Sequence, residues 1–118
     1  MSLSFPAPED GLEVEPGFVE ALRRPGGPEF RLVDCREEDE HAFCHIEGDL
    51  LVPLSRFVES IEAALPEAAV PVVIYCHHGM RSAQAASFLR ARGRSLVFSL
   101  RGGIEAWSLE VDPGVARY

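Results

Sequence analysis

The clearest indication of the fold is the segment PVVIYCHHGMRS at residues 71–82. Its first part, residues 71–75, is a continuous apolar run rich in β-branched residues, which is typical of a parallel strand buried on both faces. Its second part turns at Gly79 and leads into the Ala-rich residues 82–92, which predict a helix. A strand that passes through a short loop into a helix is the building unit of α/β folds.

The same alternation continues on both sides of this stretch. The hydrophobic pattern predicts strands at residues 11–14, 30–35, 50–52 and 96–100, and helices at residues 16–24, 37–42 and 57–65 and in a short segment that ends at Trp107. We therefore expect an α/β fold with a central, mainly parallel five-stranded sheet and helices on both of its faces.

Length and composition indicate one globular domain. The chain has 118 residues, of which 47% are hydrophobic and 25% charged, values that are ordinary for a folded protein. Residues 1–10 are polar and contain Pro, so we expect a flexible N-terminal lead-in there and a single domain over residues 11–118. We see no internal repeat that would suggest another architecture.

Charge and cysteine content exclude several classes of function. With 19 acidic and 11 basic side chains the net charge is -8, which argues against nucleic-acid binding and against anionic membrane surfaces. The longest apolar stretch, residues 69–76, is too short to cross a bilayer. An odd number of cysteines and an N-terminus without a secretory signal pattern favour a reducing compartment, and we expect a cytoplasmic protein.

Cys76 occupies a position suited to nucleophilic chemistry. It lies at the predicted C-terminal end of a central strand, where open α/β sheets bind their ligands. The helix that follows offers free N–H groups, Gly79 allows the loop to turn, and Arg81 adds a positive charge, all of which favour a thiolate. The alternative is that Cys76 only packs in the core, as most isolated cysteines do.

The chain resembles the rhodanese-like sulfurtransferase domains in their single-domain bacterial form. The resemblance extends from about residue 12 to residue 107, and its motifs occur in the family's order. They are VDCRE at 33–37, CHIEG at 44–48, LVPL at 51–54, the loop CHHGMRS at 76–82 and LRGGIEAW at 100–107.

This resemblance implies a rhodanese-like fold and a mechanism. Cys76 would attack the outer sulfur of a donor such as thiosulfate, carry that sulfur as a persulfide, and pass it to cyanide, a small thiol or a protein thiol. The active-site loop that holds the anionic sulfur would comprise His77, His78, Gly79, Met80, Arg81 and Ser82. We expect no cofactor and no metal.

Two other functions stay open on the same residues. Phosphatases and arsenate reductases that are related to this family share its Cys-loop-Arg plan, but their longer loop makes room for a tetrahedral oxyanion. Only four residues separate Cys76 from Arg81, which favours transfer of a single sulfur atom. The other alternative is a sulfur-carrier or sensing module that passes its persulfide to a protein partner.

Several residues depart from the family pattern or have two interpretations. Cys44 replaces the family's usual Gly, and Cys35 replaces a frequent Val. Two interpretations stay open for both cysteines: packing in the core, or a redox role, with Cys44 as a resolving thiol for Cys76. In the family, the loop positions of His77 and His78 influence which sulfur donor is used, and these two residues do not indicate a particular donor. The alternative is that both histidines are only exposed loop residues.

The remaining polar residues have structural interpretations. We assign Asp34 and Arg36, next to the predicted site, to an ion pair or cap in preference to substrate contact. A metal site formed by His41, Cys44 and His45 is disfavoured because no metal-ligand spacing recurs. The acidic run at residues 37–40 is interpreted as a solvated helix face.

Overall fold

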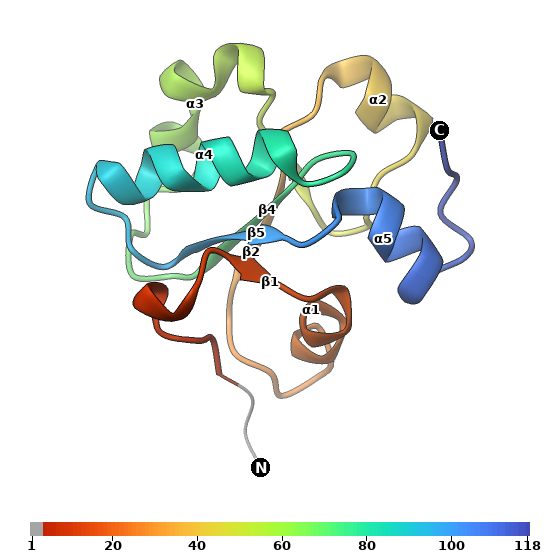
Figure 1. The fold of residues 1–118 in the computed structure, drawn as a ribbon. Helices are drawn as coiled ribbons and strands as arrows, with labels where there is room; N and C mark the ends of the chain where they lie inside the picture. Colours follow the sequence, from red (N-terminus) through yellow and green to blue (C-terminus); the bar gives the residue numbers. More distant parts are fainter. Residues whose placement is uncertain (1–3) are drawn as a thin grey trace.

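The computed structural model describes residues 4–118 of the chain. At its centre is one sheet of five parallel strands in the order β1-β5-β4-β2-β3 (Figure 1). The strands are β1 (Glu13–Val14), β2 (Arg31–Asp34), β3 (Leu50–Leu51), β4 (Val72–Tyr75) and β5 (Val97–Leu100). The expected five-stranded, parallel α/β sheet is confirmed.

Helices cover both faces of this sheet, as the sequence predicts (Figure 1). They are α1 (Pro16–Leu22), α2 (Glu38–Phe43), α3 (Phe57–Ala64), α4 (Met80–Ala91) and α5 (Gly103–Glu110), with short 3-10 helices η1 (Pro8–Asp10) and η2 (Leu54–Arg56). One core cluster joins α3 and α4 to one face of the sheet, and a second joins α1 and α5 to the other.

β4 is the middle strand of the sheet, and its side chains have apolar neighbours on both faces. All four of its residues are buried, and it pairs with β5 on one side and with β2 on the other. Val73 lies in the cluster under α1 and α5, while Ile74 lies in the cluster under α3 and α4. This two-sided burial is the physical reason for the uninterrupted apolar run in the sequence.

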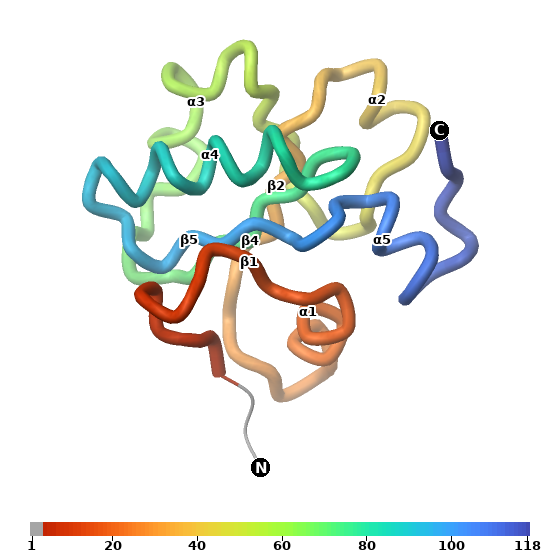
Figure 2. The backbone as a smooth tube through the Cα atoms, in the orientation of Figure 1, coloured from red at the N-terminus to blue at the C-terminus, as the bar shows by residue number. Residues whose placement is uncertain are grey.

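The loop after β4 is shorter than the sequence analysis predicts. Helix α4 begins at Met80, where we expected residue 82, because Gly79 adopts φ +108° and turns the chain directly into the helix. The predicted end of α4 is accurate, since Gly93 follows it with φ +98°. Figure 2 shows this loop projecting towards α2 and α5, which surround it.

The aromatic side chain of Phe5 packs the N-terminal segment against the domain. Phe5 stacks on Phe98 with ring centroids 5.3 Å apart and meets Phe18 edge to face at 5.7 Å. Residues 1–3 of the expected lead-in lie outside the described residues. Its flexibility, and the division into a lead-in and one domain, stay predictions. Within residues 4–118, helices are all too short or too polar to cross a membrane.

Candidate active site

The Cys76 sulfur lies at the bottom of the loop between β4 and α4. The Gly79 N–H donates to Cys76 Sγ at 3.0 Å and the Ser82 N–H at 3.3 Å, while the Ser82 hydroxyl lies 3.4 Å away. These two backbone amides belong to the first turn of α4 or immediately precede it, where N–H groups have no helical partner. The loop therefore directs its donors at a single sulfur atom.

The first turn of α5 holds the loop in this conformation. The N–H of Ile104 donates to the Cys76 carbonyl at 2.8 Å, and that of Glu105 donates to the His77 carbonyl at 3.1 Å. Gly103 makes this approach possible, because a Cβ atom there would lie 2.4 Å from both carbonyl oxygens. With its carbonyls bound on the outside, the loop turns its amides inwards. In the sequence, Gly103 is visible only as part of the motif LRGGIEAW at residues 100–107.

The surroundings of Cys76 favour its thiolate. The Cys35 thiol, which donates to the Cys76 sulfur, makes the largest contribution. Burial opposes ionisation, but the donors from Ser82 and Gly79 add to the effect of Cys35, and together they lower the pKa of Cys76 to about 5. The same contact and burial raise the pKa of Cys35, so that Cys35 remains the protonated member of the pair.

A buried hydroxyl chain orients the Ser82 side chain. Ser82 Oγ lies 2.7 Å from Ser99 Oγ, which comes from the middle of β5, and 3.2 Å from the Gly79 carbonyl oxygen. Both serines are fully buried. Since a thiolate only accepts hydrogen bonds, Ser99 supports Ser82 as a donor to Cys76.

Arg81 is paired with Glu40 of α2 rather than standing free beside Cys76. Its guanidinium makes two hydrogen bonds to the Glu40 carboxylate, at 2.7 and 2.9 Å. Arg81 is the main reason that the pKa of Glu40 falls to about 2. Our interpretation of residues 37–40 as a solvated face is therefore wrong for Glu40, because the α4 helix brings a cation against it.

The rim of the loop carries stacked aromatic rings. His77 stacks on His78 and on Tyr118, in each case with ring centroids 3.8 Å apart. The Tyr118 hydroxyl accepts from Arg36 at 2.9 Å and donates to Glu40 at 2.7 Å. Burial, followed by the neighbouring His78, lowers the pKa of His77. Met80, on the same rim, is 77% exposed.

Asp34 and Arg36 form a fully buried ion pair. The Arg36 Nε and Nη2 atoms lie 2.9 and 2.8 Å from the two Asp34 oxygens. Arg36 also donates to the Cys44 carbonyl at 2.5 Å, so that the pair ties β2 to the segment after α2. These contacts favour the structural role that the sequence suggests.

Two histidines and an aspartate gather outside the Cys76 loop. Ligand atoms of His41, His45 and Asp49 lie within 4.8 Å of one another, and Cys44 is not part of this group. The two histidine rings stack at 4.2 Å with an angle of 15° between their planes. Lone pairs of nearly parallel rings do not converge on one point, and His41 Nδ1 is already 2.9 Å from Asp34. This arrangement does not resemble a metal centre.

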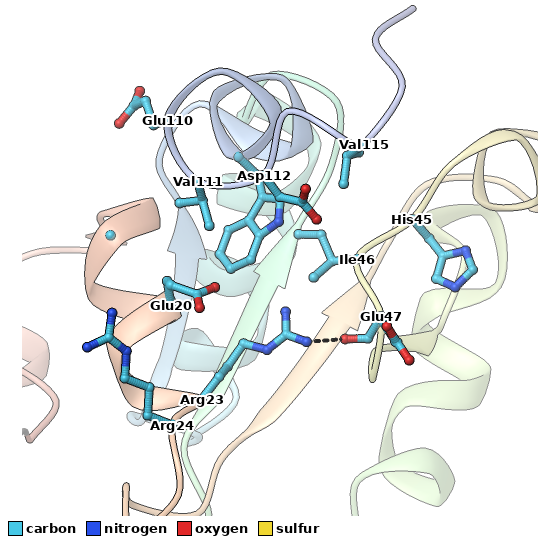
Figure 3. A pocket seen from close by; sticks show the side chains of 12 residues that line it. Glu20, Arg23, Arg24, His45, Ile46, Glu47, Glu110, Val111, Asp112 and Val115 are labelled. Atoms are coloured by element: carbon cyan, nitrogen blue, oxygen red, sulfur yellow. Dashed lines mark hydrogen bonds between the residues drawn. The ribbon is translucent and has the colours of Figure 1, made fainter.

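A cavity of about 870 Å³ lies away from the Cys76 loop, between α1, α5 and residues 45–47 (Figure 3). Charged side chains from both helices surround it, and Arg23 Nη2 donates across it to the Glu47 carbonyl at 2.6 Å. Arg23 also lies over the Trp107 ring, with 5.5 Å between the guanidinium carbon and the ring centroid. Residues 76–82 take no part in its lining.

Sequence analysis missed four residues of this site. Glu40 and Tyr118 are distant from the loop in sequence, and the local sequence pattern does not predict their contacts with Arg81 and His77. Ser99 gave a usable signal, since it is a polar residue inside an apolar strand. For Cys35 the sequence left packing and a redox role open, and it did not place Cys35 beside Cys76.

Comparison with known proteins gives a consistent family assignment. A family model, the Rhodanese-like domain, matches residues 18–110. Thiosulfate sulfurtransferase GlpE of Pseudomonas fluorescens (strain SBW25) is 37% identical over 94 residues, which cover 80% of this chain and 82% of GlpE. The probable adenylyltransferase/sulfurtransferase MoeZ of Mycobacterium tuberculosis is 36% identical over 94 residues, which cover 78% of this chain but only 24% of MoeZ.

Solved structures agree with this assignment. The rhodanese-related protein from Thermoplasma volcanium superposes with a TM-score of 0.76 at 25% identity, covering 92% of this chain and all of that one. The family model covers most of the chain, and a relative more than 30% identical to it is matched over most of its own length. The chain therefore belongs to the rhodanese-like domain family.

Proposed function

We propose that this protein is a sulfurtransferase in which the Cys76 thiolate is the nucleophile. It attacks the outer sulfur of a sulfane donor such as thiosulfate, a sulfur–sulfur bond forms, and sulfite leaves with the electron pair of the broken bond. A thiophilic acceptor, such as cyanide or a thiol, then removes the outer sulfur and restores the thiolate. The relationship to thiosulfate sulfurtransferase GlpE supports this reaction.

One observation carries the proposal: the amides of Gly79 and Ser82 converge on the Cys76 sulfur at 3.0 and 3.3 Å. Donors fixed in this way stabilise negative charge without reorganising during the reaction, as in an oxyanion hole. They favour the thiolate before the attack. After it, the negative charge of the persulfide lies on the transferred outer sulfur, which is bonded to the Cys76 sulfur inside the same loop. Thiosulfate also carries negative charge on its sulfonate group, and Arg81 gives the loop a permanent positive charge.

A protein thiol is a second candidate acceptor. The relationship to MoeZ supports it, because that relative is named as both an adenylyltransferase and a sulfurtransferase and this chain spans about a quarter of its length. On this alternative, the domain carries sulfur to a macromolecule and turns over small acceptors slowly. The cytoplasmic location expected from the sequence stays a prediction.

Steady-state kinetics tests the proposed reaction. With thiosulfate and cyanide as substrates, we expect thiocyanate formation with the parallel double-reciprocal lines of a two-step, covalent mechanism. Replacing Cys76→Ser is expected to lower the rate by about a thousandfold or more. Cys44→Ser serves as the matched control and keeps the rate. A Cys76→Ser protein with the original rate would contradict the proposal.

A further inference from the structure

Cys35 and Cys76 occupy equivalent positions at the ends of two neighbouring strands. β2 and β4 pair in parallel with Asp34 opposite Tyr75, so the next residues along the two strands, Cys35 and Cys76, face each other. The Cys35 N–H donates to the Tyr75 carbonyl at 3.0 Å, which extends the pairing to this point. Both cysteines are buried, with exposed fractions of 0% and 1%.

The two side chains also lie on the same face of the sheet. Alternation along each strand places Val33 and Cys35, and likewise Ile74 and Cys76, in the core cluster under α3 and α4. Neighbouring strands are about 4.8 Å apart. That separation falls within the range of about 4.4–6.8 Å over which the Cα atoms of a disulfide are found. The backbone therefore allows a bond between these two sulfurs.

Cys44 provides a contrast. Its side chain packs against the opposite core cluster, and its sulfur lies 3.9 Å from Arg36 Nη1. Cys44 is thus on the other side of the sheet from Cys76, although the sequence alone suggested it as a resolving thiol. The described structure favours Cys35 for any reaction between two thiols at this site.

We propose that Cys35 is a resolving thiol for Cys76. This inference rests on the proposed function, because it concerns the persulfide form. Cys35 attacks the inner sulfur of the Cys76 persulfide, and a Cys35–Cys76 disulfide forms as the bond to the outer sulfur breaks. The outer sulfur takes the electron pair and the Cys35 proton and leaves as HS⁻. Both thiols are oxidised to the disulfide, and the sulfane sulfur is reduced to sulfide.

This step changes what happens when acceptor is scarce. A loaded protein that meets no acceptor releases its sulfur as sulfide and stops in the disulfide form. A thiol reductant must then open the disulfide before Cys76 can react again. In contrast, a loaded protein that meets an acceptor transfers its sulfur before Cys35 reacts. Cys35 thereby sets the lifetime of the persulfide.

Intact mass spectrometry on three proteins tests the step: the unsubstituted chain, Cys35→Val, and the control Cys44→Ser. Each is loaded with thiosulfate, freed of small molecules and kept without acceptor. The unsubstituted chain and Cys44→Ser are expected to gain about 32 Da, lose it with release of sulfide, and end about 2 Da below the starting mass. Cys35→Val is expected to keep its gain. Equal persistence in all three would overturn the proposal.

A second reagent separates this inference from the proposed function. If none of the proteins gains mass with thiosulfate, the sulfurtransferase proposal fails, and dilute hydrogen peroxide then tests the cysteine pair alone. Peroxide converts the Cys76 thiolate to a sulfenic acid, and Cys35 displaces its oxygen as water. A loss of about 2 Da that is absent in Cys35→Val supports the resolving pair, whereas equal oxygen additions in both proteins overturn it.

Discussion

The acidity of Cys76 gives the sharpest quantitative prediction. The contact with the Cys35 thiol makes the largest contribution to lowering the pKa of Cys76 to about 5. Replacing Cys35→Val removes the S–H donor and leaves an apolar side chain of similar size. A hydrogen bond to a charged group contributes about 1.5–3 kcal/mol, and about 1.4 kcal/mol corresponds to one pKa unit. We therefore expect the pKa of Cys76 to rise by about 1–2 units.

The sign follows from which form the donor stabilises. Cys35 donates to the thiolate, so its loss destabilises the charged form and moves ionisation to higher pH. The pH dependence of Cys76 alkylation by iodoacetamide measures this midpoint, with the modified residue located by peptide mass. We expect a midpoint near pH 5 in the unsubstituted protein and of about 6–7 in Cys35→Val. Cys44→Val is the control and keeps the original midpoint. An unchanged midpoint in Cys35→Val would show that Cys35 does not stabilise the Cys76 thiolate.

Three further changes test other parts of the site. Glu40→Gln removes the carboxylate that pairs with Arg81, which leaves the Arg81 guanidinium available to thiosulfate, so the KM for thiosulfate should fall about three- to tenfold. A rise in KM would count against a role of Arg81 in binding the sulfur donor. Asp34→Asn leaves the buried Arg36 guanidinium without its anion, so the free energy of unfolding from a urea titration should fall by about 3–5 kcal/mol. A loss below about 1 kcal/mol would be inconsistent with the buried ion pair. Gly103→Ala places a Cβ atom against the carbonyls of Cys76 and His77, so both the melting temperature and the rate of Cys76 alkylation should fall. An unchanged alkylation rate would show that the first turn of α5 does not hold the loop.

Much of the fold follows from local sequence signals. The apolar run of β4, the turn at Gly79 and the Ala-rich helix after it are each visible in one stretch, and their order along the chain implies a parallel sheet. The start of α4 was predicted two residues late, because the pattern of apolar side chains begins only after Ser82. The backbone is already helical from Met80, after the turn at Gly79, whose carbonyl accepts from the Ala83 N–H at 3.1 Å.

The missed parts of the site depend on contacts between distant segments. Arg81 meets Glu40 across 41 positions of sequence, and the Tyr118 hydroxyl meets the same carboxylate across 78. Such contacts arise from the strand order, which places α2 and the C-terminal segment beside the loop. Since a helix face with several acidic residues is usually solvated, local sequence gives no reason to single out Glu40.

The pairing of Cys35 with Cys76 is likewise a contact between segments that are distant in sequence. Each cysteine could be placed at a strand end from sequence, but only the β2–β4 register shows that the two face each other. A shift of that register by one residue would have put them on opposite faces of the sheet. The tertiary arrangement, and not the local pattern, therefore decides which thiol acts on Cys76.

The central claim is that Cys76 accepts a sulfane sulfur covalently, and intact mass after brief incubation with thiosulfate measures this directly. We expect a gain of about 32 Da that maps to Cys76 and is lost on adding cyanide. Cys76→Ser is expected to show no gain under the same conditions. A protein that keeps its mass with thiosulfate and with a persulfide donor, or that gains equally after Cys76→Ser, would contradict the account.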